Sequence, residues 1–387
     1  MKVTIEIMAP TVIGGMDPIP ECDFLISGTK ALRIQVFHSL RKMRNEDGSK
    51  WLELFDAFMK EKGRERGDGS RDDAYNRLFQ FLLRQKEVGS LSFFSNEFAI
   101  NSKDFWRNGP VIPTVHYVDS QGTMTPLIPG SSVKGALRRA LVFSLLRENV
   151  KLSGARDVDT NGAAVDKFLD SIEMRRNSLE SSDSVLLALK LFRSQLDDAM
   201  RFLQVSDFMP GNEFGLAILQ SEGKVTSRRV KTNYLAITSG RFYGDINLSR
   251  SFPTVLESYK GLRKSKLLEY LCGMHTDVLS AGSFDQIEKV IVENLIGLAD
   301  SYARENGKSD YALDRSSRHV ILGTGKGAPL TTVIRSNPRI VQYVMQKGFR
   351  VRARGGINSI REPKTKAYFS VDSGKVRPGL CRIEVMK

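Results

Sequence analysis

Residues 129–141, Pro-Gly-Ser-Ser-Val-Lys-Gly-Ala-Leu-Arg-Arg-Ala-Leu, carry the strongest structural signal in this chain. The Pro-Gly pair ends an extended run at residues 111–128, and Ser131 or Ser132 can cap a new helix by accepting a hydrogen bond from a free N–H of its first turn. The apolar residues that follow recur at helical spacing, which predicts that one face packs inward. They are Val133, Ala136, Leu137, Ala140, Leu141 and Leu145.

The other faces of this predicted helix are cationic, because they carry Lys134, Arg138 and Arg139. The N-terminus of a helix has free N–H groups and a partial positive charge, so it attracts anions. Gly130 and Gly135 allow another backbone to approach closely. The stretch therefore suits a phosphate backbone, although a well-capped surface helix that binds nothing has the same capping signals.

Residues 128–138, I-P-G-S-S-V-K-G-A-L-R, closely resemble the I-P-G-S-S-x-K-G-x-x-R signature of the RAMP proteins of type III CRISPR effector complexes. Other segments follow in the order typical of the fifth subunit of the type III-A (Csm) complex. The last of these segments, residues 378–383, lacks the aromatic residue that this family often has there. The four segments are residues 5–15 (Ile-Glu-Ile-Met-Ala-Pro-Thr-Val-Ile-Gly-Gly), 203–207 (Leu-Gln-Val-Ser-Asp), 322–327 (Leu-Gly-Thr-Gly-Lys-Gly) and 378–383 (Pro-Gly-Leu-Cys-Arg-Ile).

The resemblance implies an α+β fold with a RAMP core of RRM or ferredoxin-like ancestry, a second divergent ferredoxin-like part and helical insertions. It divides the chain into an N-terminal RAMP domain, residues 1–250, and a C-terminal part, residues 251–387. The first has helical insertions at about 45–95 and 150–203. The second combines a helical segment with basic, RAMP-like strands and a glycine-rich loop.

The net charge points independently to a polyanionic partner. The chain has 58 Lys and Arg against 44 Asp and Glu, a formal net charge of +14, and a pI near 9.6. Residues 318–387 hold 15 of these cations and only 3 of the anions, so the excess charge is concentrated there. The segment also has apolar, strand-like patterning, which favours a folded basic surface over a solvated tail.

Residues 349–354, Phe-Arg-Val-Arg-Ala-Arg, alternate strictly between apolar and basic side chains. In a strand this pattern places Arg350, Arg352 and Arg354 on one face. Guanidinium groups pair with phosphates and stack on bases, so such a row can follow a single RNA strand without reading its sequence. A charged edge strand that avoids aggregation would have the same pattern.

The loop Gly323-Thr324-Gly325-Lys326-Gly327 matches neither common nucleotide-binding fingerprint. A P-loop has Ser or Thr after its Lys, and a Rossmann loop is G-x-G-x-x-G near the start of a βαβ unit. No ATP, NAD or other cofactor is therefore expected. The remaining interpretation is a loop whose backbone lies against a phosphate chain, with Lys326 as a point charge.

The resemblance implies a non-catalytic subunit that binds crRNA, caps its 3′ side, and is needed for 3′-end maturation and complex assembly in antiviral defence. Its expected partners are crRNA, the neighbouring RAMP backbone subunit, the small subunit, nearby target RNA and trimming nucleases. The predicted RNA-binding residues are Gly130, Ser131, Ser132, Lys134, Arg138, Arg139, His319, Gly323, Gly325, Lys326, Gly327, Arg350, Arg352 and Arg354.

Two alternatives remain open. One is a repeat-cleaving RAMP endoribonuclease, in which His38 would serve as the acid or base. The other is the RAMP subunit that holds the crRNA 5′ tag. None of the four histidines lies in a metal-binding motif, so no metal site is predicted. For Asp207 a helix cap or a core ion pair is favoured over a general base or metal ligand.

Composition is that of an ordinary globular chain of 387 residues, with 41% hydrophobic and 26% charged residues. No run is long and apolar enough for a membrane span and no signal peptide is recognisable, so we expect a cytoplasmic protein. The three cysteines show no paired spacing, which argues against disulfides and zinc knuckles.

Periodicity predicts strands and helices in separate blocks, as in an α+β protein. The predicted strands are residues 2–8, 216–219, 225–237 and 242–248. The predicted helices, besides the one at 130, include residues 51–59, 78–83, 165–174, 184–203, 255–271 and 284–304.

Overall fold

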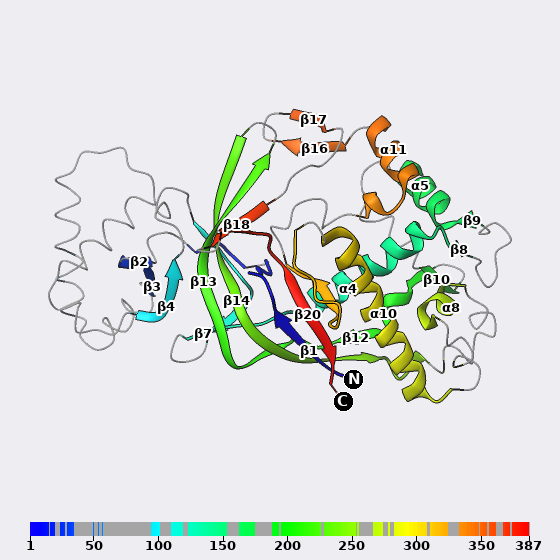
Figure 1. Cartoon of the computed structure of the whole chain (residues 1–387), viewed down its shortest axis with the longest axis horizontal. Coiled ribbons are helices and arrows are strands. Elements are labelled where there is room, and N and C mark those ends of the chain that lie inside the picture. The colour runs from blue at the N-terminus through cyan, green and yellow to red at the C-terminus, as the bar shows by residue number, and fades with distance from the viewer. Residues whose placement is uncertain are drawn as a thin grey trace.

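The structure is a computed structural model of the whole chain (Figure 1). It describes residues 1–14, 16–19, 24–27, 29–34, 49, 53, 56, 94–100, 110–118, 123–152, 162–174, 188–192, 195–225, 228–252, 254, 266–273, 278, 282–307, 310–323, 333–347, 349–353, 356–360, 367–371 and 374–386. Of the helix predicted at 51–59 only residues 53 and 56 are described, both as helix, and the helix predicted at 78–83 lies outside the described residues, as does most of the insertion predicted at about 45–95.

The described elements are mostly strands, which follow one another in groups with helices between the groups. The helices are α4 (Gly130–Arg147), α5 (Ala164–Met174), α8 (Lys266–Cys272), α10 (Phe284–Gly307) and α11 (Pro338–Lys347), with short 3₁₀ helices η5 (Ala199–Phe202) and η8 (Ile334–Ser336). The strands are β1 (Lys2–Ile7), β2 (Phe24–Ser27), β3 (Lys30–Ile34), β4 (Phe94–Ile100), β5 (Val111–Pro113), β6 (His116–Val118), β7 (Met124–Pro126), β8 (Lys151–Leu152), β9 (Gly162–Ala163), β10 (Ala188–Phe192), β11 (Gln195–Asp198), β12 (Leu203–Val205), β13 (Met209–Val225), β14 (Arg228–Leu248), β15 (His319–Ile321), β16 (Phe349–Ala353), β17 (Gly356–Ile360), β18 (Ala367–Val371), β19 (Gly374–Val376) and β20 (Leu380–Val385).

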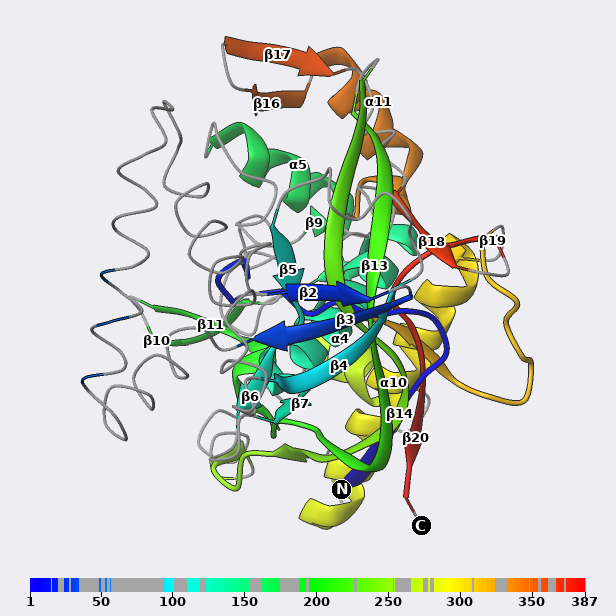
Figure 2. The same ribbon diagram turned by 90° about the vertical axis from the view of Figure 1, so that its left-hand side faces the viewer.

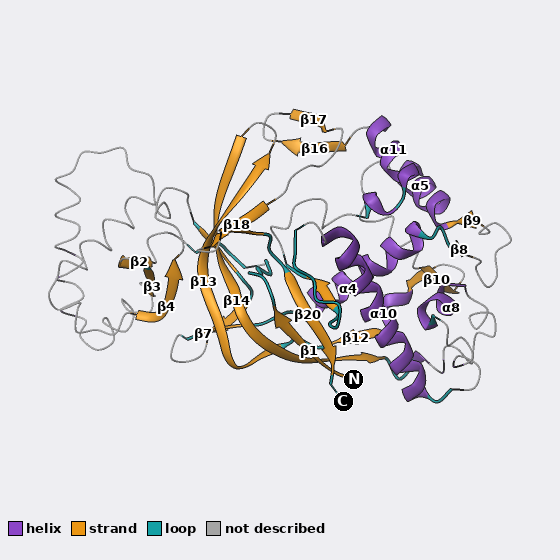
Figure 3. Ribbon diagram, viewed as in Figure 1, coloured by secondary structure: helices purple, strands orange, loops and turns teal. Residues whose placement is uncertain are grey.

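The centre of the fold is a ferredoxin-like unit. Strands β20, β1, β14 and β12 lie in this order and all neighbouring pairs are antiparallel. Helix α4 connects β1 to the β12 side, and α10 connects β14 to the strands at the β20 edge. Both helices pack on the same side of the sheet (Figures 1 and 3). The fold class is therefore as predicted.

The alternation of side chains along β1 explains why α4 and α10 pack on one of its faces. Val3, Ile5 and Ile7 are buried and point toward α4 and α10, while Thr4 and Glu6 lie on the other face and are only half-buried. The helices supply the matching apolar faces, and every inward residue predicted for the helix at 130 is buried. Prediction and structure agree here because both periodicities, 2 and 3.6, point to the same core.

A long antiparallel ribbon, formed by β13 and β14, extends beyond this unit. Its middle is buried on both faces: β2–β4 and β5 cover one side, and Phe369 of β18 lies in a small cluster with Ala217 and Ala236 on the other (Figure 2). The ribbon therefore joins three apolar clusters within one 12-stranded sheet.

Strands from both predicted domains belong to this one sheet. β15, β18 and β20 come from the C-terminal part, yet β20 pairs with β1 and β18 pairs with β13. The boundary at residue 250 stays a prediction. The sheet shows that each side of that boundary contributes strands to the same hydrogen-bonded surface.

The helix predicted at 184–203 was wrong. Residues 188–198 form the hairpin β10–β11, and η5 leads into β12. The apolar spacing fits a helix, but Leu203 pairs with Leu248 of β14, so the chain must turn back to reach the sheet. The tertiary pairing overrides the local pattern. The strand predicted at 225–237 begins too early: Val225 is the last residue of β13, and the next strand, β14, begins at Arg228.

Other predictions were confirmed. The strand at 2–8 and the helices at 165–174 and 284–304 match β1, α5 and α10 to within a few residues. The helix at 255–271 is described only where α8 forms its end. Among the helices that the structure describes, none has both the length and the apolar character that a membrane span requires.

Gly244 provides a test of packing in the ferredoxin-like unit. A Cβ on Gly244 would stand 2.7 Å from Cγ of the fully buried Phe208 ring, so Gly244→Ala should destabilise the fold by about 1–3 kcal/mol. At Gly211 of the neighbouring strand the nearest atom is the ring of the exposed Tyr243, which can move aside. Thermal unfolding should show a clear loss for Gly244→Ala and little change for Gly211→Ala; equal losses would contradict this account.

Candidate nucleic-acid interface

The first turn of α4 is held by the segment that follows β12. The backbone N–H of Gly130 donates to the Asp207 carboxylate at 2.8 Å, and Ile128 and Phe208 exchange two backbone hydrogen bonds. A Cβ on Gly130 would stand 2.2 Å from the carbonyl oxygen of Val205, so only glycine fits. The two sequence motifs at 128–138 and 203–207 are therefore one structural unit.

The cap of this helix differs from the prediction. Pro129 occupies the N-cap position and no side chain of the first turn caps the helix, so the expectation for Ser131 and Ser132 was wrong. Asp207, 77 residues further along the chain, provides the capping oxygen instead. The sequence interpretation of Asp207 as a cap was confirmed. Its carboxylate also occupies the helix end where a phosphate would otherwise be favoured.

Lys134 is tied to the same segment. Its Nζ donates to the carbonyl oxygen of Leu203 at 2.7 Å, and burial, followed by the charge of Arg138, lowers its pKa. This bond attaches the second turn of α4 to β12. Lys134 thus has a structural contact, and an RNA contact by the same ammonium group stays a prediction.

The exposed side of α4 has a stripe that we call the α4 stripe: Ser131, Ser132, Gly135, Arg138 and Arg139. These residues are three or four positions apart, so they share one face of the helix. Ser131 is exposed and the other four are half-buried. Along the stripe, two hydroxyl groups therefore lie on one side of Gly135 and two guanidinium groups on the other.

Gly135 lies in the middle of this stripe and faces open space. Apart from the neighbouring backbone of its own helix, no atom of the described structure lies within 4 Å of the position where its Cβ would stand. A glycine inside a helix costs about 0.5–1 kcal/mol relative to alanine. Packing against the described residues does not explain that cost, unlike at Gly130, whereas close approach of an external backbone would.

Tyr302 of α10 is buried beside α4. Its ring packs edge-on against Phe143, with centroids 5.0 Å apart. Burial raises the pKa of Tyr302 to about 12, while the charges of Arg139 and Arg377 act in the opposite direction.

The remaining motif segments meet at a second place, beside β1. Gly323 has a φ of +80°, and a Cβ on it would stand 2.3 Å from the carbonyl oxygen of Val12. The N–H of Gly379 donates to Pro10, and that of Leu322 donates to Gly379. The N-terminal, glycine-loop and closing segments are thus neighbours in space.

Buried polar contacts fix this second cluster. Arg377, only 1% exposed, forms an ion pair with Asp310. The hydroxyl of Tyr311 donates to the carbonyl oxygen of Pro378 at 2.6 Å, and burial raises its pKa. Removing one member of a buried ion pair leaves a charge without compensation, so this contact holds the closing segment strongly.

His319 points into the fold. It is 1% exposed, and both its backbone N–H and its Nδ1 lie within 3.2 Å of the Asp300 carboxylate. Asp300 also accepts from Arg304 at 2.7 Å. The structure therefore gives His319 a role in attaching β15 to α10, and its contact with RNA stays a prediction.

Other predicted residues are described only in part. Phe349–Ala353 forms the strand β16, paired with β17, which confirms the strand that contains Arg350 and Arg352. Arg354, Gly325, Lys326 and Gly327 lie outside the described residues, as does His38 of the endoribonuclease alternative. The described part of the chain contains no group of three or more His, Cys, Asp or Glu side chains that could hold a metal ion.

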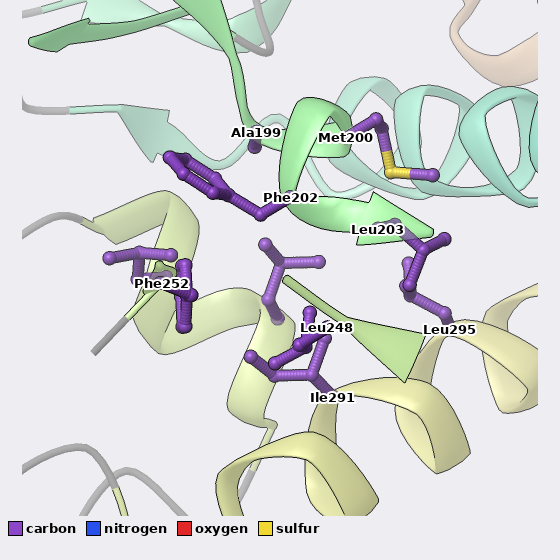
Figure 4. Close-up of a pocket in the computed structure, with 10 residues that line it drawn as sticks. Ala199, Met200, Phe202, Leu203, Leu248, Phe252, Ile291 and Leu295 are labelled. Carbon is purple, nitrogen blue, oxygen red and sulfur yellow. The ribbon is translucent and has the colours of Figure 1, made fainter. Parts of the chain in front are cut away.

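One pocket lies inside the helical side of the fold, between η5, β12, β14, α8 and α10 (Figure 4). Its walls are apolar side chains, among them Phe202, Leu248, Phe252, Ile291 and Leu295. Such walls have no donor for a phosphate and no acid or base for catalysis. The pocket therefore belongs to the core.

Replacing Asp207 distinguishes the hydrogen bond that it accepts from the start of α4 from the effect of its negative charge on the helix. Asp207→Ala removes the cap and should lower the free energy of unfolding by about 0.5–2 kcal/mol. Asp207→Asn keeps an oxygen acceptor and should preserve most of that stability. Thermal unfolding of both variants checks this. A loss for Asp207→Asn as large as for Asp207→Ala would show that the carboxylate charge, rather than the hydrogen bond, holds the helix.

Comparison with known proteins agrees with this geometry. The RAMP superfamily model matches residues 111–358. A chain from the cryo-EM structure of a Csm–crRNA–target RNA ternary complex in a type III-A CRISPR-Cas system has a TM-score of 0.66 and 17% identity, covering 99% of this chain and 100% of that one. The crystal structure of T. onnurineus Csm5 has a TM-score of 0.53 and 16% identity, covering 98% and 99%. No curated protein matches the sequence. With the signature helix docked on its partner segment, a ferredoxin-like sheet and a family match over most of its length, this chain belongs to the RAMP superfamily.

Proposed function

We propose that this chain is a non-catalytic, crRNA-binding subunit of a type III-A CRISPR effector complex. It grips the 3′ side of the crRNA, ends the row of RAMP subunits and shields the RNA so that trimming nucleases produce the mature 3′ end. The role belongs to cytoplasmic antiviral defence. Its partners are the crRNA, the neighbouring backbone RAMP subunit and the small subunit, with target RNA nearby.

The observation that carries this proposal is the open space at Gly135 within the α4 stripe. A phosphate chain that crosses α4 there comes close to the helix backbone. Ser131 and Ser132 can donate to its oxygens at one end, and Arg138 and Arg139 lie at the other. These contacts reach phosphate and sugar, so they bind RNA independently of sequence.

Charge and fold support the same conclusion. The net charge of +14 favours a polyanion as ligand. Two solved chains share the fold over nearly their full length: one is a Csm5, and the other comes from a Csm complex with crRNA and target RNA. The two histidines among the described residues have structural contacts, His116 with the backbone of Thr114 and His319 with Asp300.

The decisive experiment purifies the effector complex with and without this chain and sequences both ends of the bound crRNA. Intact 5′ tags with altered or missing mature 3′ ends are expected. Precursor RNA left uncleaved would instead indicate the repeat endoribonuclease, which His38→Ala would then inactivate. Disturbed 5′ ends alone would indicate the subunit that holds the 5′ tag.

Arg138→Ala with Arg139→Ala tests the α4 stripe on the free chain. If each arginine neutralises one phosphate, the slope of log affinity against log salt should fall by about 1.4 for single-stranded RNA, equally for unrelated sequences. Fluorescence anisotropy with two labelled RNAs at several salt concentrations measures this. A loss confined to one sequence would contradict backbone binding.

Gly135→Ala tests the open space itself. Alanine should raise the stability of the free chain by about 0.5–1 kcal/mol and weaken RNA binding, because its methyl group fills the gap. Gly297→Ala is the matched control, since Gly297 also lies inside a helix and, apart from the neighbouring backbone of that helix, has no atom of the described structure within 4 Å of its Cβ position. It should raise stability and leave RNA affinity unchanged. Equal RNA affinity for both variants would remove Gly135 from the interface.

A further inference from the structure

The ferredoxin-like sheet has a second face, turned away from α4 and α10. The register of the strands identifies what lies on it: Thr4 of β1 lies opposite Tyr243 of β14 on one side and Glu384 of β20 on the other. Met209 of β13 lies opposite Tyr243 as well. We call this surface the open face: the outward residues of β1, of the Arg241–Asp245 part of β14 and of β20, together with Met209.

The open face carries an unusual share of the exposed apolar side chains. Seven large apolar residues of the described structure are exposed, and four of them, Met8, Met209, Tyr243 and Met386, lie here. Tyr243 and Met209 are 43% and 42% exposed and are cross-strand neighbours. Met8 and Met386 follow β1 and β20 and continue the outward alternation.

Charge distinguishes this face from the rest of the molecule. Its charged residues are three cations and three anions: Lys2, Arg241 and Arg382 against Glu6, Asp245 and Glu384. Glu6 accepts from Arg382 at 3.0 Å and lies 3.8 Å from Arg241. The face is therefore neutral in a chain of net charge +14, and the cations that would attract RNA are balanced by carboxylates.

A neutral surface with an exposed tyrosine, methionines and an arginine has the composition of a protein interface. Tyrosine, methionine and arginine are enriched at such interfaces. Tyrosine buries a large ring at low entropic cost, and methionine adapts to the shape of its partner. The side chain of Arg241 is 63% exposed, so its guanidinium can still pair with a partner's carboxylate.

We propose that the open face is the docking surface for a neighbouring protein subunit, which presents an apolar centre against Tyr243 and Met209 and a carboxylate toward Arg241. This inference rests on the proposed function, because it assumes that the chain joins an effector complex. It assigns the two ligands to different sides of one sheet: RNA to the helix side, at the α4 stripe, and protein to the open face.

The test uses the full-length chain and an effector complex assembled from the other subunits and crRNA without it. Adding back the chain restores the complex, and mass photometry measures its affinity. The double variant Tyr243→Ala with Met209→Ala should bind the complex at least about tenfold more weakly, as expected for residues at the centre of an interface. Its affinity for free labelled crRNA should equal that of the wild type.

Two further variants control the result. Met16→Ala with Val118→Ala removes apolar side chains that are 37% and 44% exposed but lie away from the open face, and should join the complex like the wild type. Arg241→Ala, which changes an exposed side chain and leaves the apolar pair intact, should weaken docking by several-fold. It keeps the proposal testable if the double variant unfolds at a lower temperature.

The outcomes separate the two proposals. Wild-type docking by both Tyr243→Ala with Met209→Ala and Arg241→Ala would overturn the docking surface and leave the proposed function intact. A loss of RNA affinity with unchanged docking would make the open face an RNA surface and overturn the inference. A wild-type chain that does not join the complex would overturn the proposed function, and the docking surface with it.

Discussion

The rest of the structure depends on how the first turn of α4 meets the backbone after β12. There Gly130 comes so close to the carbonyl oxygen of Val205 that no side chain fits, and its N–H reaches the carboxylate of Asp207. Lys134 adds a bond to Leu203 one turn later. These contacts set where α4 lies along the sheet, and so determine which of its faces packs inward and which stays available to a ligand.

This arrangement changes the meaning of the I-P-G-S-S-x-K-G pattern. Some of its residues hold the helix to the sheet and others are available to a ligand, although in the sequence they form a single motif. Gly130 and Lys134 hold the helix to β12, whereas Ser131, Ser132, Gly135, Arg138 and Arg139 face outward. The pattern predicted a helix with an apolar face and a cationic face, and both are present. Which polar residues support the fold depends on contacts 69 and 77 residues away in sequence, and no local pattern contains them.

The same limit explains the errors in the sequence-based fold. Val3, Ile5 and Ile7 in β1 and the apolar face of α4 were predictable because periodicity alone decides which side is buried. Residues 188–198 have helical spacing but form a hairpin, because Leu203 has to reach Leu248. His319 looked accessible beside a glycine loop, yet Asp300 of α10 draws it into the core. The open face left no signal in the sequence, since it is assembled from strands at opposite ends of the chain.

The position of β1 has a consequence for how this protein is made. β1 lies between β14 and β20, and Ile5 pairs with Phe242 on one side and with Ile383 on the other. Figure 1 accordingly shows the N- and C-termini side by side. Contacts between residues so distant in sequence are slow to form, and strand edges that have not yet paired favour aggregation. During synthesis β1 must remain without its neighbours until β14 and then β20 have been made. Until both have been made, the edges of β1 lack the strands that pair with them in the folded protein.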